Sequence, residues 1–377
     1  SPDWNLAAKT GKHVCMSSDT PRADQIATFL TGAGWGNVDI HWFDQDASTR
    51  RYARLTRPNG ATAILMDAPP VEDDPCTPDM SPEDRIQLGW NAVTRLASSR
   101  VDAFVLIADH LRTAGLRPPH VHAHDSAAGL AILEDFGHQR EFARLIEQGM
   151  DEVPLYERAA QDLAALHRHP KPDTLIMGAE CWPILEFDAV ALSANADLFA
   201  DWYHVHDARA QMTDANRAKW QQARDELIAR AMAFPRDFTL RDYHAENLLW
   251  LPEGRIGLLD FQDAVLGWDA WDMAMLTQDA RRPVSDAAVS SAIRAYLDAT
   301  GKEEAAFQER LAVIGTLNAL RIAGVFARLV ERDGKPRYKD FMPRQLMMLA
   351  RNLNHPAAAG MRGFIADTAP FILEAGS

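Results

Sequence analysis

The alternation of hydrophobic and polar residues divides the chain into two parts. The first, of about 135 residues, contains short apolar runs typical of strands, whereas the second is chiefly helical. In the first part, apolar spacing from about Ala23 to Leu30 predicts a short helix, and VDIHWF predicts a strand. The runs DQDASTRRYARL and ATAILMDAPP, joined through Pro58, Asn59 and Gly60, predict a β-hairpin, and HVHAHDSAAGLAILEDFG predicts another.

The second part of the chain shows mainly helical periodicity. It is clearest in LYERAAQDLAALHRH, ANRAKWQQARDELIARAMA, AAVSSAIRAYLDA and FQERLAVIGTLNALRIAGVFARLVERD, and two strand-like runs, FTLRDY and RIGLLDF, interrupt it. The last of these helices is apolar on most sides from Leu317 to Val330, which predicts burial inside this part. The first part also contains a second expected helix, from about Asp102 to Ala114, which Gly115 ends.

Composition narrows the class of protein. With 377 residues, 47% of them hydrophobic, the chain can bury a large core, and this length favours two lobes or domains over one. The net charge of -14 argues against general affinity for nucleic acid or an anionic membrane, although it leaves room for a locally basic pocket. Three distant cysteines indicate neither a disulfide framework nor a thiolate zinc site. We therefore expect a monomer in the cytoplasm that binds neither membrane nor nucleic acid.

The segment LRDYHAENLLWLPEGRIGLLDFQD supplies candidate chemistry. Asp242 is followed five residues later by Asn247, and Asp260 ends the apolar run that comes next. In phosphoryl transfer, one carboxylate orients the attacking hydroxyl while an asparagine and a second carboxylate hold magnesium. A single aspartate here would more simply cap a turn, but the combined spacing favours the catalytic interpretation. Asp272, at an expected helix start, either bonds the backbone of the catalytic loop or caps that helix.

These residues carry a family resemblance. The pattern R-D-x-x-x-x-N, L-L-D-F, G-x-x-x-x-D resembles the aminoglycoside phosphotransferase and choline kinase group. More narrowly, the chain resembles the bacterial N-acetylmuramate/N-acetylglucosamine anomeric kinases over roughly Gln25 to Arg344. The strings that carry this narrower resemblance are DASTRRYARL, ILMDAPP, LEDFG, LRDYHAENLLWL, LLDFQDAVLG, QDARR and FARLVERDGKPRY.

The resemblance implies a fold and an activity. The fold would be α+β and bilobal, protein-kinase-like, with a β-rich N-lobe and a mainly helical C-lobe. We place an N-terminal extension at residues 1–20, a nucleotide-covering N-lobe at 21–136 and a catalytic and substrate-binding C-lobe at 137–377. The enzyme would use ATP and Mg²⁺ to phosphorylate the C1 hydroxyl of a small-molecule amino sugar, N-acetylmuramate and/or N-acetylglucosamine, during cell-wall recycling.

The nucleotide-binding residues depart from the usual kinase pattern. A kinase strand V-A-I-K ends in a phosphate-binding lysine, but AILM ends here in Met66. Arg50 and Arg51 are the candidate replacements, because guanidinium groups bind phosphate oxygens well. Ser48 and Thr49, in a covering loop without a glycine series, are further phosphate candidates.

The run LEDFG stands where two lobes would join. There Glu134 and Phe136 would offer backbone groups to adenine, and the alternative is a simple strand end that turns at Gly137.

The acceptor pocket is less well defined by sequence. The substrate candidates are the neighbours of the catalytic aspartate, Arg241 and His244, and the downstream residues Gln278, Asp279, Arg281 and Arg282. Arginines there would suit the carboxylate of N-acetylmuramate, whereas a polycationic aminoglycoside would need acidic residues. The double arginine also fits a solvated helix end. Two alternatives stay open: a kinase of another small-molecule hydroxyl, and a nucleotide-binding pseudokinase scaffold that has lost the strand lysine.

Overall fold

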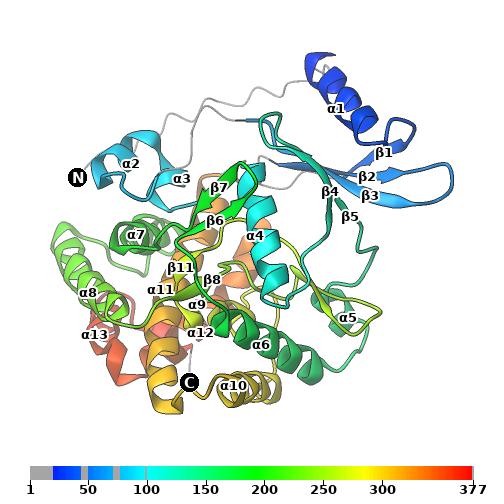
Figure 1. Cartoon of the computed structure of the whole chain (residues 1–377). Coiled ribbons are helices and arrows are strands. Elements are labelled where there is room, and N and C mark those ends of the chain that lie inside the picture. Colours follow the sequence, from blue (N-terminus) through cyan, green and yellow to red (C-terminus); the bar gives the residue numbers. More distant parts are fainter. Residues whose placement is uncertain (1–19, 44–49, 71–76, 98–99, 376–377) are drawn as a thin grey trace.

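A computed structural model of the chain describes residues 20–43, 50–70, 77–97 and 100–375. The α+β prediction is confirmed, since a sheet and one helix form one side of the molecule and helices form the other (Figure 1). The predicted phosphate residues Ser48 and Thr49 lie outside the described residues, as does the proposed extension up to residue 19.

The N-terminal sheet is antiparallel and has the strand order β1-β2-β3-β5-β4. Its strands are β1 (Asp39–Trp42), β2 (Arg51–Thr56), β3 (Thr62–Asp67), β4 (Val121–Asp125) and β5 (Leu130–Glu134). Helix α1 (Thr20–Gly32) packs on one face, where its Ile26 and Leu30 share a core with Ala53 and Leu55 of β2. Because side chains alternate along a strand, the residues on either side of Ala53 face the helical lobe instead.

The segment between β3 and β4 contacts both lobes. It forms α2 (Pro82–Leu88), α3 (Trp90–Val93) and α4 (Val101–Thr113), which confirms the helix expected before Gly115. Phe104 and Ile107 of α4 lie in the larger core, which joins residues of the sheet to those of the helices. Arg85 of α2 pairs with Asp188 at the start of α7. This segment therefore lies within the predicted N-lobe range of 21–136 but also packs against elements that come later in the chain, including β6 and β7.

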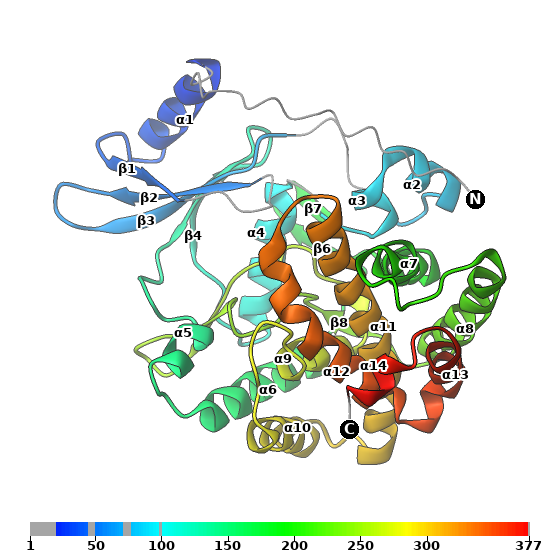
Figure 2. The ribbon, with the colours of Figure 1, turned by 180° about the vertical axis from the view of Figure 1, so that it is seen from behind.

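The helical lobe is built around one long central helix, α11 (Glu304–Glu331), which packs against α7, α9 and α12. It is the one helix in the described ranges that is long and apolar enough to cross a membrane, and 67% of its apolar window is buried. The surrounding helices are visible in Figure 2. They are α5 (Phe142–Glu147), α6 (Glu152–Arg168), α7 (Ala189–His206), α8 (Asp214–Met232), α9 (Asp269–Thr277), α10 (Asp286–Thr300), α12 (Met342–Leu353), α13 (Ala359–Thr368) and α14 (Phe371–Glu374), with 3₁₀ turns at Pro336–Phe341 and Pro356–Ala358.

Three small two-stranded sheets interrupt the helices. β6 (Thr174–Met177) pairs with β7 (Glu180–Pro183), and the sequence pattern did not reveal this pair. β8 (Asp237–Thr239) pairs with β11 (Val265–Gly267), and β9 (Leu248–Trp250) with β10 (Ile256–Leu258). The loop from β8 to β9 carries the expected catalytic residues, and the segment after β10 carries the second expected metal ligand.

Candidate active site

Asp272, in the first turn of α9, holds the loop after β8 in place. This fully buried carboxyl accepts hydrogen bonds from the backbone N–H groups of Leu240 and Arg241, at 2.7 and 2.9 Å. Burial raises the pKa of Asp272 to about 8, although the two N–H donors oppose the shift. The prediction that Asp272 bonds the loop backbone is confirmed, and the loop is thereby tied to α9.

The structure brings the three predicted catalytic and metal residues together. Asn247 donates its side-chain Nδ2 to the backbone carbonyl of Asp242 at 2.9 Å, and its own carbonyl accepts from the N–H of Leu259 at 3.0 Å. These two bonds tie the catalytic loop to the end of β10, directly before Asp260. Asp260 has a left-handed backbone, with φ of 55°, which turns the chain sharply at this point.

The side chain of Asp260 lies in a cleft with 47% of its surface exposed. Its Oδ1 accepts from Gln262 at 2.9 Å and lies 3.3 Å from the guanidinium of Arg50. Desolvation by the surrounding protein raises the pKa of Asp260, and the negative charge of Asp242 raises it further. Two neighbouring carboxylates that repel one another suit a bound cation, and the oxygen donors of Asp260 and Asn247 are of the kind that Mg²⁺ prefers.

A divalent cation here would need ligands from outside the protein. Within the described ranges, no group of three or more His, Cys, Asp or Glu side chains is placed to hold a metal alone. Magnesium in phosphotransferases is typically bound by one or two protein oxygens together with phosphate oxygens and water. The donor set formed by Asn247 and Asp260 therefore fits a metal that arrives with a nucleotide.

A cavity of about 630 Å³ lies between the sheet and the catalytic segments. Its lining includes three residues predicted to bind nucleotide, Arg50, Glu134 and Phe136, and both predicted metal ligands, Asn247 and Asp260. No lysine is among the described residues that line it. This volume is within the range of small-molecule sites, about 300 to 1,000 Å³.

Arg50 is the cation of this cavity nearest to the metal residues. Its side chain is only 12% exposed. Burial lowers the pKa of Arg50, but the charges of Tyr52, Asp263, Asp260 and Asp242 outweigh burial and raise the pKa overall. The guanidinium therefore stays charged in a position suited to phosphate oxygens.

Arg51 lies on the opposite face of β2 and does not line the cavity. Its guanidinium pairs with Asp67, which is fully buried and also accepts from Arg22 of α1 at 2.6 and 3.1 Å. The strand position expected to hold lysine is occupied by Met66, which is buried in the core. Of the two arginines proposed in place of that lysine, strand alternation directs only Arg50 to the nucleotide cavity.

The segment after β5 borders the cavity as predicted, but the side chains of its two candidates have structural tasks. The carboxylate of Glu134 accepts from Arg117 at 2.6 and 2.7 Å, and this bond, assisted by the N–H of His120, lowers the pKa of Glu134. The ring of Phe136 packs on Gly257 of β10 so closely that a Cβ there would lie 2.9 Å from two ring carbons. The backbone groups of this segment, not these two side chains, remain available to bind adenine.

Arg54 lines the same cavity and was not singled out from the sequence. Its guanidinium donates to both carboxylate oxygens of Asp135, at 2.6 and 3.0 Å, and lies 5.5 Å from the ring centre of Phe43. It thus holds the segment after β5 to the sheet. The alternation of side chains along a strand could have identified Arg54, because residues 50, 52 and 54 share one face.

A smaller cavity, of about 90 Å³, lies on the other side of Asp242. Four of the six predicted substrate residues line it, namely His244, Gln278, Asp279 and Arg281. Burial, followed by the charge of Arg281, lowers the pKa of His244 to about 3, so its imidazole is neutral at pH 7. Asp279 is buried, and its Oδ2 has no hydrogen-bond partner within the described ranges.

The other two substrate candidates do not line this cavity. Arg241 has a φ of 76°, and its guanidinium donates to the carbonyls of Thr94 and Arg95 at 2.9 and 3.2 Å. It therefore braces the loop against the segment before α4 instead of facing the acceptor. Arg282 is half-buried outside the cavity, whereas its neighbour Arg281 lies at the rim, 3.4 Å from Glu246.

Arg321 of α11 is a further residue of the acceptor cavity. It donates to Asn318 at 2.9 and 3.1 Å and lies 5.4 Å from the ring centre of Trp271. Burial lowers the pKa of Arg321 to about 10, while the charge of Asp242 opposes the shift. Arg321 and Arg281 together give the cavity two cations in a protein whose net charge is -14.

Comparisons with known proteins agree with this geometry. The model of the phosphotransferase enzyme family matches residues 39–307. An N-acetylmuramate/N-acetylglucosamine kinase of Caulobacter vibrioides is 44% identical over 361 residues, 94% of this chain and 99% of that protein. A kinase of the same name from Pseudomonas putida is 30% identical, covering 85% of this chain and 86% of its own.

Solved structures give the fold. A choline/ethanolamine kinase family protein from Mesorhizobium loti has a TM-score of 0.53 at 14% identity, covering 91% of this chain and 99% of its own. An amicoumacin kinase, solved with AMP-PNP and Ca²⁺, has a TM-score of 0.55 at 13% identity, covering 89% and 96%. The expected kinase-like arrangement of a β-rich and a helical lobe is confirmed.

Proposed function

The chain belongs to the phosphotransferase enzyme family and, within it, to the N-acetylmuramate/N-acetylglucosamine kinases, and we propose that it transfers the γ-phosphoryl group of ATP to the C1 hydroxyl of both sugars. The observation that carries the proposal is that the catalytic loop borders both cavities. Asp242 lines the smaller cavity, while Asn247, bonded to its backbone carbonyl, lines the larger one. A hydroxyl held at Asp242 would face a triphosphate held beside Asn247 and Asp260.

Asp242 orients the C1 hydroxyl and accepts its proton. The sugar oxygen forms a bond to the γ-phosphorus, the bond from that phosphorus to the β–γ bridging oxygen breaks, and ADP leaves. Arg50 neutralises phosphate charge, and Asn247 with Asp260 would hold Mg²⁺. When bound, Mg²⁺ supplies further neutralisation of the triphosphate charge.

The acceptor cavity favours an anionic or neutral sugar over a polycation. Arg281, at the cavity rim and only loosely paired with Glu246, is the residue we assign to the lactyl carboxylate of N-acetylmuramate. Arg321 adds a second, buried positive charge beside Asp242. A polycationic aminoglycoside would meet both arginines, and like charges in a confined site cost several kcal/mol.

An acceptor panel tests the proposal. N-acetylmuramate, N-acetylglucosamine and a cationic aminoglycoside are compared in one coupled assay of ADP release, with phosphorus NMR of each product. We expect an acid-labile anomeric phosphate from both amino sugars and none from the aminoglycoside. Absence of product with both amino sugars would refute the substrate assignment.

We also propose that the reaction takes place in the cytoplasm, where ATP is supplied, and serves the recycling of cell-wall sugars. Both sugars named for the relatives are cell-wall building blocks, which supports this context. Deletion in a bacterium that carries this protein should lead to accumulation of the two free sugars in cell extracts. Unchanged sugar levels after deletion would argue against the recycling role.

A further inference from the structure

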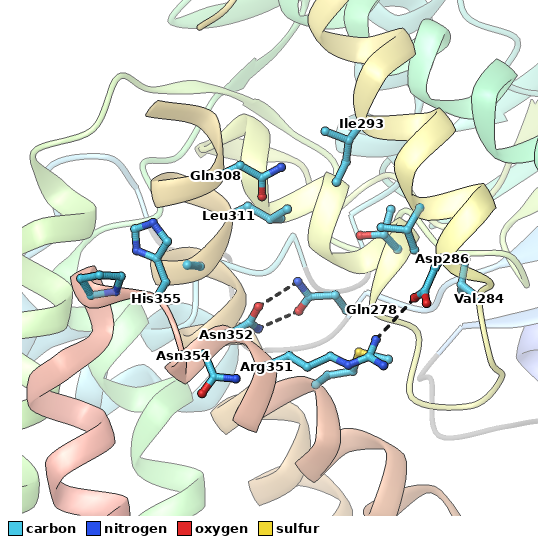
Figure 3. Close-up of a pocket in the computed structure, with 15 residues that line it drawn as sticks. Gln278, Val284, Asp286, Ile293, Gln308, Leu311, Arg351, Asn352, Asn354 and His355 are labelled. Atoms are coloured by element: carbon cyan, nitrogen blue, oxygen red, sulfur yellow. Dashed lines mark hydrogen bonds and ion pairs between the residues drawn. The ribbon is translucent and has the colours of Figure 1, made fainter. Parts of the chain in front are cut away.

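A third cavity, of about 450 Å³, lies behind the acceptor cavity. Figure 3 shows its lining, which comes from the end of α9, from α10 and α11, and from α12 with the turn after it. Much of this lining is aliphatic, with Val289, Ile293, Leu311 and Met348 among its residues. Gln278 is the residue that lines both cavities, so its side chain forms part of the wall between them.

The side-chain amides of Gln278 and Asn352 form that wall by hydrogen-bonding to each other. Gln278 donates to the side-chain oxygen of Asn352 at 3.1 Å, and Asn352 donates to that of Gln278 at 2.8 Å, as the two dashed lines in Figure 3 show. The pair rests directly on the backbone of α11 at Gly315. A Cβ at Gly315 would lie 2.7 Å from Nδ2 of Asn352 and 3.1 Å from Oε1 of Gln278. The helix therefore leaves space for the pair by having no side chain at this position.

The acceptor cavity alone is too small for the sugars proposed. At about 90 Å³ it falls well below the range of small-molecule sites, about 300 to 1,000 Å³. The additional volume lies behind the amide pair. Both sugars named for the relatives carry an N-acetyl group, which has one N–H donor, one carbonyl acceptor and one methyl group. The two side chains that close the wall are also amides, and each has a carbonyl acceptor and an NH₂ group with two donors.

We propose that Gln278 and Asn352 recognise the acetamido group common to both sugars and that their mutual pairing opens toward the rear cavity when the sugar enters. The substrate amide exchanges hydrogen bonds with the two side chains, so no buried polar group is left without a partner. The methyl group then lies against the aliphatic lining. A sugar with a hydroxyl at this carbon has no methyl group to place against the aliphatic lining and is disfavoured. This inference rests on the proposed function, because it assigns the group by which that function selects its substrate.

The test compares N-acetylglucosamine with glucose, which differ at this one substituent. The readout is the ratio of the two kcat/KM values, and partial unfolding leaves it unchanged because it lowers both values equally. We expect Gln278→Leu to lower kcat/KM for N-acetylglucosamine by about 10- to 100-fold, chiefly through KM, while the value for glucose changes little. Gly315→Ala keeps both amides but displaces them, and it should shift the ratio in the same direction.

The matched control is Gln345→Leu. Gln345 is a buried amide on α12 that donates to the carbonyl of Ala319 on α11 at 3.1 Å and lines neither cavity. This variant loosens the same helix interface and should leave the ratio unchanged. The proposal is overturned if Gln278→Leu and Gly315→Ala keep the wild-type ratio, or if Gln345→Leu shifts it as much as they do. Failure of the proposed function is distinct, because then the wild-type protein phosphorylates neither N-acetylated sugar.

Discussion

Single substitutions of the adjacent residues Arg50 and Arg51 should distinguish an arginine that binds nucleotide from one that stabilises the sheet. We expect Arg50→Gln to impair catalysis with ATP and Arg51→Gln to impair stability. Arg50 lies in the nucleotide cavity, with its guanidinium 3.3 Å from Asp260, whereas Arg51 pairs with the fully buried Asp67 on the opposite face. The two substitutions remove the same charge one residue apart, so each is the control for the other.

The magnitudes follow from these environments. A charge-assisted hydrogen bond to phosphate contributes about 1.5 to 3 kcal/mol, so Arg50→Gln should lower kcat/KM for ATP roughly 10- to 150-fold. Removing one partner of a fully buried ion pair costs about 3 to 5 kcal/mol. Arg51 is 34% exposed and Asp67 retains Arg22, so we expect Arg51→Gln to lower the free energy of unfolding by about 1 to 2 kcal/mol.

Two measurements decide the outcome. ATP-dependent ADP release with saturating sugar gives kcat/KM, and urea unfolding gives the change in stability. If Arg50→Gln keeps kcat/KM for ATP within twofold of wild type, or if Arg51→Gln lowers it as much as Arg50→Gln does, the assignment of the phosphate-binding cation is refuted.

Three further predictions concern the base, the nucleotide wall and pH. Asp242→Asn should lower turnover about 10²- to 10⁴-fold while calorimetry still detects ATP binding, and substantial remaining turnover would contradict its role. Gly257→Ala should raise KM for ATP several-fold and leave KM for the sugar unchanged, because the new Cβ would displace the ring of Phe136. His244, with its pKa lowered to about 3, stabilises the fold fully above pH 6.5, and this contribution is lost as pH falls, since only the unfolded chain then takes up the proton. Between pH 6.5 and 5 the wild type should therefore lose roughly 2 kcal/mol more unfolding free energy than His244→Gln, and parallel pH profiles would contradict this.

Periodicity predicted most of the fold because most elements bury one face. It identified α1, the two hairpins of the sheet and the long helix α11. It did not reveal the β6–β7 hairpin, whose strands have only four residues each and leave Ile176 exposed. It predicted α4 but not its packing, since apolar spacing shows that a helix face is buried but not which partner covers it.

The spacing of Asp242, Asn247 and Asp260 predicted the centre of the site because all three lie within one short, continuous segment. Side-chain direction was not predictable in the same way. Arg241 turns away from the acceptor because its backbone is left-handed, and nothing in its sequence neighbourhood requires that conformation. Arg321 reaches the cavity from a helix that begins more than 40 residues after Asp260, so only tertiary packing identifies it.

The pairing of Asp67 with Arg22 and Arg51 has a practical consequence for how the protein is produced. Arg22 lies in the first turn of α1, only two residues after the first described residue, and donates to a carboxylate that solvent does not reach. A truncation that removes α1 would strip this cation from the back of the sheet and also expose the core formed by Ile26 and Leu30. Shortened variants for crystallisation should therefore keep α1 intact, and purification tags are better placed at the C-terminus than fused directly before this helix.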